Sequence, residues 1–157
     1  MKQVKKGLVP SETKFRSGFT LIELLVVIAI IGLLSTLAVV ALGSARKKAN
    51  DSKRLADVKQ VQTALELYYT DNNSYPTTTA QVNLGTGNYT CLGSSGFGAS
   101  GCASPYMGLV PAGPGSAEYY TYNSSAGTDY VITAVLEVGA GNFVAGTVSA
   151  TPSGLTQ

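Results

Sequence analysis

The chain has 157 residues, with eleven Lys or Arg against nine Asp or Glu, a formal net charge of +2, and neither His nor Trp. The lack of His excludes His-based catalytic triads and His metal ligands. Charged residues make up only 13% of the chain, a poor stock for acid–base chemistry. A chain of this length accommodates one compact domain and a membrane segment.

The small net charge hides a block arrangement along the sequence. Residues 1–18 carry +4, residues 19–45 carry −1, residues 46–59 carry +4, and residues 60–157 carry −5. This distribution disfavours a uniformly basic nucleic-acid-binding protein. In an assembly of several copies, it suggests that the basic segment of one copy meets the acidic C-terminal part of a neighbour.

The first predicted element is a 24-residue apolar run from Phe19 to Leu42, in which Glu23 is the one charged residue. About 20 such residues span a bilayer as a helix, so a membrane segment is predicted. A polar, basic stretch precedes the run and no A-x-A-like site follows it, unlike a secretory signal peptide. A cut between Gly18 and Phe19 fits better, because Gly lets a protease approach the backbone closely.

The residues GFTLIE at 18–23, followed by the apolar run, resemble the processing motif of type IV pilins and pseudopilins. The resemblance covers residues 14–45 and extends in weaker form to about Pro76. It implies that residues 1–18 are a leader, that prepilin peptidase cleaves after Gly18 on the cytoplasmic side, and that Phe19 is then N-methylated. It also implies a filament built by packing the apolar helices together.

Glu23 has a predicted assembly role. A carboxylate within hydrocarbon is unfavourable in free energy, so we expect Glu23 to have a partner. Cleavage after Gly18 creates one, the α-amine of Phe19, and we expect the amine of an incoming subunit to pair with Glu23 of a neighbour. The alternative is that Glu23 lies at the membrane interface, one helical turn into the run.

Apolar or small residues then recur at steps of three and four, which indicates an amphipathic helix. One helix from about Phe19 to Asp71 is predicted, with residues 19–43 as the membrane and assembly part and residues 44–73 continuing into a head. Asn tolerates a left-handed C-cap and Pro76 cannot continue a helix, so the helix ends there. The predicted packing face consists of Ala45, Ala49, Leu55, Ala56, Val58, Val61, Ala64, Leu65, Tyr68 and Tyr69. The predicted exposed face carries Arg46, Lys53, Arg54, Lys59 and Glu66.

Residues 74–149 are predicted to form a β-rich head. Alternating patterns and turn residues place strands at Tyr119–Asn123, Tyr130–Glu137 and Asn142–Val148. The expected fold class is α+β, a long N-terminal helix packed on a small antiparallel sheet of about three strands. Residues 150–157 show no pattern and are expected to be a mobile tail.

Two features of the head bear on chemistry. Cys91 and Cys102 are predicted to form a disulfide that stabilises the head by roughly 3 kcal/mol, and their C-x₁₀-C spacing matches no zinc site. Glu118, Asp129 and Glu137 are candidate calcium ligands, since some major pseudopilins bind calcium in this region. Their alternative role is a solvated face, because no EF-hand spacing links them. No other cofactor and no enzymatic activity are expected.

The main functional hypothesis is a major pilin, the structural subunit of a type IV pilus-like filament. The disulfide favours it, because major pseudopilins commonly lack that loop. The alternatives are a pseudopilin of a type II secretion system and a pilin-like anchored binding module. Expected partners are further copies of the chain, prepilin peptidase, the pilus or secretion assembly machinery and the membrane. The precursor is expected in the cytoplasmic membrane and the filament in the periplasm or outside the cell, where adhesion, motility and DNA uptake all remain open.

Overall fold

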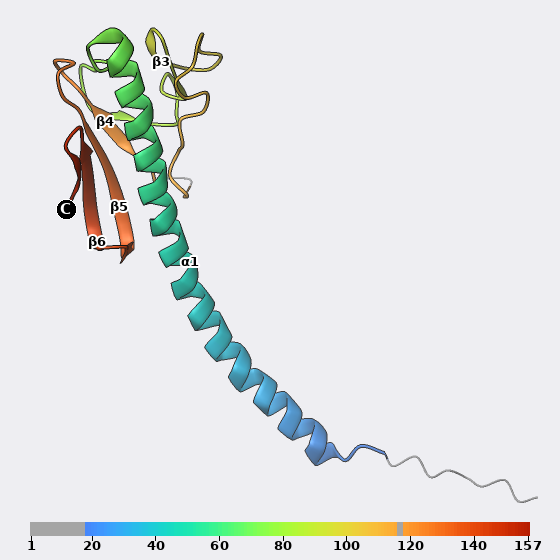
Figure 1. Ribbon diagram of the computed structural model, residues 1–157. Helices are drawn as coiled ribbons and strands as arrows, with labels where there is room; N and C mark the ends of the chain where they lie inside the picture. Colours follow the sequence, from blue (N-terminus) through green and yellow to red (C-terminus); the bar gives the residue numbers. More distant parts are fainter. Residues whose placement is uncertain (1–17, 116–117) are drawn as a thin grey trace, which may run out of the picture. The chain divides into compact units, whose positions relative to one another are not determined.

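The computed structural model describes residues 18–115 and 118–157, so the predicted leader, residues 1–17, lies outside the described residues. Contacts divide the chain into a unit that ends at Val40 and a unit from Ala41 to Gln157. The helix α1 (Leu21–Asn72) begins in the first unit and ends in the second, and the described strands all belong to the second (Figure 1). The predicted α+β class is confirmed.

The head contains an antiparallel five-stranded sheet with the order β1-β4-β5-β6-β7. Its strands are β1 (Val82–Asn83), β4 (Thr121–Asn123), β5 (Val131–Ala140), β6 (Phe143–Thr151) and β7 (Gly154–Thr156). A separate hairpin is formed by β2 (Cys91–Gly93) and β3 (Gly96–Gly98). The three predicted strands correspond to β4, β5 and β6. The others have two or three residues each, and unlike β4, which is part of the predicted run Tyr119–Asn123, they lie in no run that the sequence pattern indicates as a strand.

The C-terminal residues differ from the expected mobile tail. Thr151 ends β6, and the following strand β7 pairs with the last three residues of β6. Gly154 has φ +127°, which favours glycine and lets the chain reverse immediately after β6. The side-chain amide of Gln157 donates to and accepts from the backbone of Val144, at 2.9 Å in each direction. The polar tail is therefore held by backbone pairing, which hydrophobic alternation does not reveal.

The end of α1 agrees with the predicted C-cap. Asn73 has φ +53°, and its N–H donates to the carbonyl oxygen of Tyr69 at 2.8 Å. The side-chain amide of Asn72 donates to the Tyr68 carbonyl at 2.9 Å. The backbone N–H of Asn73 and the side-chain amide of Asn72 thus satisfy carbonyl groups that the end of a helix leaves without partners.

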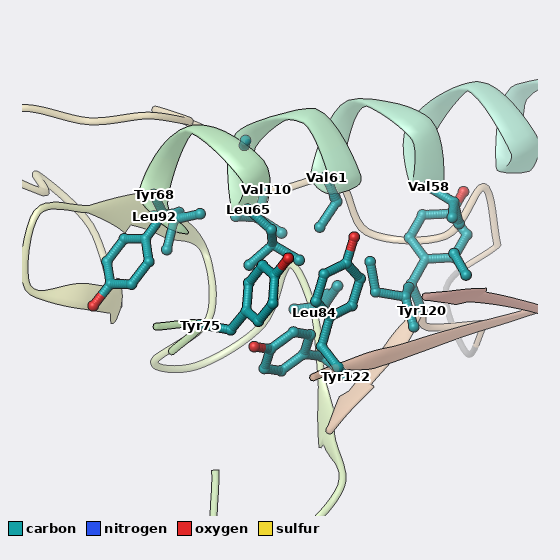
Figure 2. Close-up of a cluster of buried hydrophobic side chains, with 14 of the residues drawn as sticks. Val58, Val61, Leu65, Tyr68, Tyr75, Leu84, Leu92, Val110, Tyr120 and Tyr122 are labelled. Carbon is teal, nitrogen blue, oxygen red and sulfur yellow. The ribbon is translucent and has the colours of Figure 1, made fainter. Parts of the chain in front are cut away.

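The core lies between the second part of α1 and the sheet. Figure 2 shows Val58, Val61 and Leu65 of the helix facing the aromatic rings of Tyr120 and Tyr122, and all five side chains are at most 2% exposed. Alternation along β5 places Ile132, Ala134 and Leu136 in the buried layer. The helix and the sheet therefore share one hydrophobic core.

Tyrosines fill much of this core and keep partners for their hydroxyl groups. Tyr120 donates to a carboxylate oxygen of Asp57 at 2.8 Å, and Tyr122 donates to the Pro76 carbonyl at 2.7 Å. Tyr75 donates to Glu66 at 3.1 Å. Burial and the neighbouring Glu66 carboxylate raise the pKa of Tyr75 to about 12. These three hydroxyls therefore remain protonated donors at neutral pH, and each has an acceptor.

The packing face of α1 differs from the predicted one in its first turns. Ala45, Ala49 and Ala56 are exposed, whereas Asp51 and Arg54 are 0% and 2% exposed. From Val58 onward the predicted apolar positions are buried, apart from Tyr69. A pattern built on apolar residues cannot detect a face that packs through paired charges, and for this reason it places Arg54 on the exposed face.

A matched pair of leucines tests this packing. Leu65 is fully buried and Leu67 is 52% exposed, two residues away on the same helix. We expect Leu65→Ala to lower the free energy of unfolding by about 2–5 kcal/mol, and Leu67→Ala to change it by less than about 0.5 kcal/mol. Denaturant titration of the full chain in detergent, followed by tyrosine fluorescence, measures both. Equal effects of the two substitutions would contradict the assigned face.

Candidate functional site

The first part of α1 presents an apolar surface that no part of the described chain covers. Sixteen large hydrophobic side chains, from Phe19 just before the helix to Leu42 within it, are between 49% and 91% exposed. Among the described residues, α1 is the one helix long and apolar enough to cross a membrane. A continuous apolar surface of this size requires lipid or apolar protein surfaces around it.

Glu23 closes a capping box at the start of this helix. Its carboxylate accepts hydrogen bonds from the backbone N–H of Thr20 at 2.7 Å and from the Thr20 hydroxyl at 2.8 Å. The Thr20 hydroxyl in turn accepts from the N–H of Glu23 at 3.3 Å. Thr at the N-cap and Glu three residues later satisfy two amide groups that a helix start leaves unpaired. Glu23 therefore has a partner within its own chain. The T-x-x-E spacing of Thr20 and Glu23 is the local signal that predicts this partner.

The predicted processing junction lies just before this cap. Gly18, Phe19 and Thr20 are exposed and precede the first helical residue, Leu21. A Cβ atom added to Gly18 would have no neighbour within 4 Å. In the described chain Phe19 is joined to Gly18, so its nitrogen is an amide, and the bonds of Glu23 go to Thr20. The junction is thus an accessible, non-helical segment next to a capped helix.

A charge cluster fixes the second part of α1 to the sheet. Between Leu136 and Gly139 the pairing of β5 with β6 shifts register. The backbone N–H groups of Glu137, Val138 and Gly139 all donate to the carboxylate of Asp51, at 2.9, 2.8 and 2.8 Å. A β-bulge points successive amides in one direction, which here gives the buried carboxylate three donors.

Arg54 completes the cluster. Its guanidinium donates to Asp51 at 2.5 Å and to Glu137 at 3.2 Å, and it also pairs with Glu118. Lys47 approaches Glu137 at 3.8 Å from the exposed side. One buried cation therefore links the helix to β5 and to the segment that precedes β4, and its five donors can serve several carboxylates at once.

The pKa values within the cluster follow from this geometry. Burial alone would raise the pKa of Asp51, but the three backbone donors and Arg54 outweigh it, so this pKa is lowered. Burial alone would lower the pKa of Arg54, and its pairing with Glu118, Asp51 and Glu137 raises it instead. Both groups are therefore charged at neutral pH.

The three candidate calcium ligands are not brought together. Glu118 and Glu137 pair with Arg54. The Asp129 carboxylate accepts instead from the backbone N–H of Tyr130 at 2.7 Å. Within residues 18–115 and 118–157, no group of three or more His, Cys, Asp or Glu side chains could hold a metal ion. The guanidinium of Arg54 supplies the positive charge that balances the two glutamates.

The predicted disulfide between Cys91 and Cys102 is present, with Cα atoms 6.1 Å apart. It joins β2 to the segment after β3. A Cβ atom added to Gly98 would lie 2.9 Å from the sulfur of Cys102, and one added to Gly93 would lie 2.8 Å from the Cβ of Cys102. Glycines on both strands therefore allow this close approach.

Comparison with known proteins agrees with these features. Residues 13–43 match the model of the prokaryotic N-terminal methylation motif, and residues 41–148 match that of type II secretion system protein G. The chain belongs to the type II secretion system protein G family. Members of this pilin-like family are structural filament subunits of secretion or pilus machinery rather than enzymes, which confirms the expected absence of enzymatic function.

The relatives include proteins of both kinds of machinery. Type II secretion system core protein G of Aeromonas hydrophila is 46% identical over 63 residues, which are 40% of this chain and 44% of the relative. The Escherichia coli (strain K12) core protein G is 44% identical over 66 residues, 42% of this chain and 46% of the relative. The type IV wide pilus major component PilA4 of Thermus thermophilus is 46% identical over 69 residues, 43% of this chain and 53% of the relative.

These matches cover only part of each relative. The chain spans less than half the length of the two secretion relatives. No solved structure is significantly similar to it. The predicted resemblance to pilins and pseudopilins is confirmed, and the motif match at residues 13–43 indicates a membrane-anchored precursor. The relatives do not distinguish the pilus interpretation from the secretion alternative.

Asp51 provides a pH-dependent test of the charge cluster. Its folded pKa lies below the unfolded value of about 3.9, so its stabilising contribution is present above about pH 5 and is lost as the pH falls through the folded pKa. We expect Asp51→Asn to lower the free energy of unfolding at pH 7 by about 3 kcal/mol and to flatten its fall on acidification.

The control for this substitution is Asp71→Asn. Asp71 is an exposed acid on the same helix that accepts a hydrogen bond from the Tyr106 hydroxyl. Its substitution should change the free energy of unfolding by less than about 0.5 kcal/mol. Denaturant titrations at several pH values measure both variants. An unaltered pH profile in Asp51→Asn would show that the cluster does not anchor the helix.

Proposed function

We propose that this chain is a filament subunit that assembles through the apolar part of α1 after prepilin peptidase cleaves between Gly18 and Phe19. The observation that carries the proposal is the continuous exposure of sixteen large apolar side chains from Phe19 to Leu42. Lipid covers this surface in the precursor, and the same segments of neighbouring copies cover it in the filament. Packing of apolar helices against one another supplies the main attraction.

In this proposal Glu23 exchanges one set of partners for another. Before assembly the Thr20 cap satisfies its carboxylate. Cleavage converts the nitrogen of Phe19 into a cationic amine, and N-methylation leaves that charge in place. In the filament the amine of an incoming subunit pairs with Glu23 of its neighbour, which fixes the register between copies. Attraction without such a pair would not select one register along an apolar surface.

Three variants separate capping from charge pairing. Glu23→Gln retains a residue that completes a capping box but has no charge. Thr20→Val removes the hydroxyl cap but retains the carboxylate. Glu23→Ala removes both functions. We expect all three to be cleaved and methylated at Phe19, as measured by mass spectrometry of the N-terminus. Filament yield, counted by electron microscopy, should fall at least about tenfold in both Glu23 variants and persist in Thr20→Val.

The outcome for Glu23→Gln decides between the two roles. Normal filaments from this variant, together with none from Thr20→Val, would assign Glu23 to capping alone. An intact Met1 on the native protein would contradict the proposed processing itself.

The kind of filament is proposed to be a surface pilus. The support is the disulfide-closed loop of the head, together with the match to the pilus component PilA4 over 53% of that relative. The second candidate is the short pseudopilus of a type II secretion system. It is favoured by the family match over residues 41–148 and by the core protein G relatives.

Electron microscopy of producing cells separates these candidates. We expect long fibres at the cell surface that react with antibodies against this chain, and loss of those fibres when the chain is deleted. Secretion of enzymes into the medium should continue in the deletion strain. Absent fibres together with a secretion defect would establish the pseudopilus instead.

A further inference from the structure

The segment that follows the apolar run carries exposed positive charge that the fold does not neutralise. Residues 46–59 contain six cations and two acids. Both acids are buried, Asp51 at 0% and Asp57 at 7% exposed, and Arg54 is the one buried cation. The exposed surface of this segment, all of which the structure describes, is therefore cationic, with no carboxylate on it.

These cations have few partners within the chain. Among the described residues, no acid forms an ion pair with Arg46, Lys48, Lys53 or Lys59, and Lys47 reaches Glu137 only at 3.8 Å.

The acids of the head, in contrast, have hydrogen-bond or ion-pair partners within the same chain. Glu118 and Glu137 pair with Arg54, and the remaining carboxylates accept hydrogen bonds from the head itself: Glu66 from Tyr75 and Tyr130, Asp71 from Tyr106, and Asp129 from Tyr130. The pairing of basic segments with the acidic heads of neighbouring copies stays a prediction, because hydrogen bonds from neutral tyrosines leave the negative charge of these carboxylates in place.

Three of the cations lie close to the end of the apolar run. Arg46, Lys47 and Lys48 follow Leu42 by four to six residues, which is about 6–9 Å along a helix. The polar headgroup layer on each side of a bilayer is about 5–7 Å thick. Lys53 and Lys59 follow Leu42 by about 17 and 26 Å, beyond that layer. If the apolar run lies in hydrocarbon, Arg46 lies within the headgroup layer, and Lys47 and Lys48 lie at its outer edge, where their long side chains can reach back to the phosphates.

We infer that Arg46, Lys47 and Lys48 form a binding surface for the phosphate groups of anionic phospholipids. This inference rests on the proposed function, because it requires that α1 lies in a membrane before assembly. Arg binds phosphate through paired donors and Lys through a point charge, and each cation near an anionic membrane strengthens binding about fivefold. The buried state of Asp51 matters here, since an exposed carboxylate three residues from Lys48 would repel the same phosphates.

Native mass spectrometry tests this inference on the full-length chain. The chain is placed in bilayer discs that contain equal amounts of phosphatidylglycerol and phosphatidylcholine, and the lipids released with it are counted. We expect phosphatidylglycerol to exceed phosphatidylcholine about fivefold or more. Arg46→Gln/Lys48→Gln should reduce this preference about fivefold or more, and any contribution of the basic leader, residues 1–18, is the same in every variant.

Lys53→Gln/Lys59→Gln is the matched control, because it removes the same number of exposed, unpaired cations from beyond the headgroup layer. It should retain the preference, and circular dichroism checks that both variants keep the helix. Equal counts of the two lipids in the unsubstituted chain would overturn the inference, as would equal losses in both variants. So would carbodiimide cross-links in filaments from Lys47 or Lys48 to acids of a neighbouring copy, which would assign the surface to a second copy. Insertion into discs without any lipid preference would leave the proposed function intact.

Discussion

A single helix in this protein has to be stable in two different surroundings. The first part of α1 exposes apolar side chains all around, so it needs lipid or other apolar helices. The second part packs one face on a sheet and leaves the other in water. The sequence meets both demands by changing composition along one uninterrupted helix, from apolar residues to charged residues after Leu42.

The attachment depends on charge as well as on hydrophobic packing. Val58, Val61 and Leu65 would hold the helix on the sheet but would tolerate some sliding, because apolar contacts are not directional. Asp51 removes that freedom, since its carboxylate must meet three amides of a β-bulge. A buried carboxylate without those donors would be strongly destabilising. The bulge and the helix therefore fix each other's register.

The sequence predicted those features that arise from local patterns. The apolar run, the helix end near Asn73 and the three principal strands follow from hydrophobic periodicity, capping residues and turn residues, and all are present. The processing motif, which led to the correct family, is also local. Alternation cannot reveal β7, because that strand has three residues and is held by backbone pairing.

The candidate site shows the same limit. The sequence pattern places Arg54 on the exposed face and assigns no role to Asp51, because their partners, Glu118 and the bulge at Glu137, lie more than sixty residues away in sequence. No local signal identifies such a pair, apart from its i, i+3 spacing. The capping role of Glu23 was different, since T-x-x-E is a local signature. The predicted partner of Glu23 belongs to another subunit, whereas the structure shows a partner three residues away, at Thr20.

The capping box at Thr20 has a consequence for what the Glu23 pair contributes to assembly. A carboxylate left bare in hydrocarbon would make a waiting subunit unstable and its capture nearly irreversible. Because Glu23 already accepts two hydrogen bonds from Thr20, the assembly proposed above would replace one set of donors by another. The Glu23 pair would then contribute less to holding a subunit in the filament than it would for a carboxylate that has no partner in the membrane. Its contribution would lie in selecting the register between copies, while apolar packing supplies the main attraction.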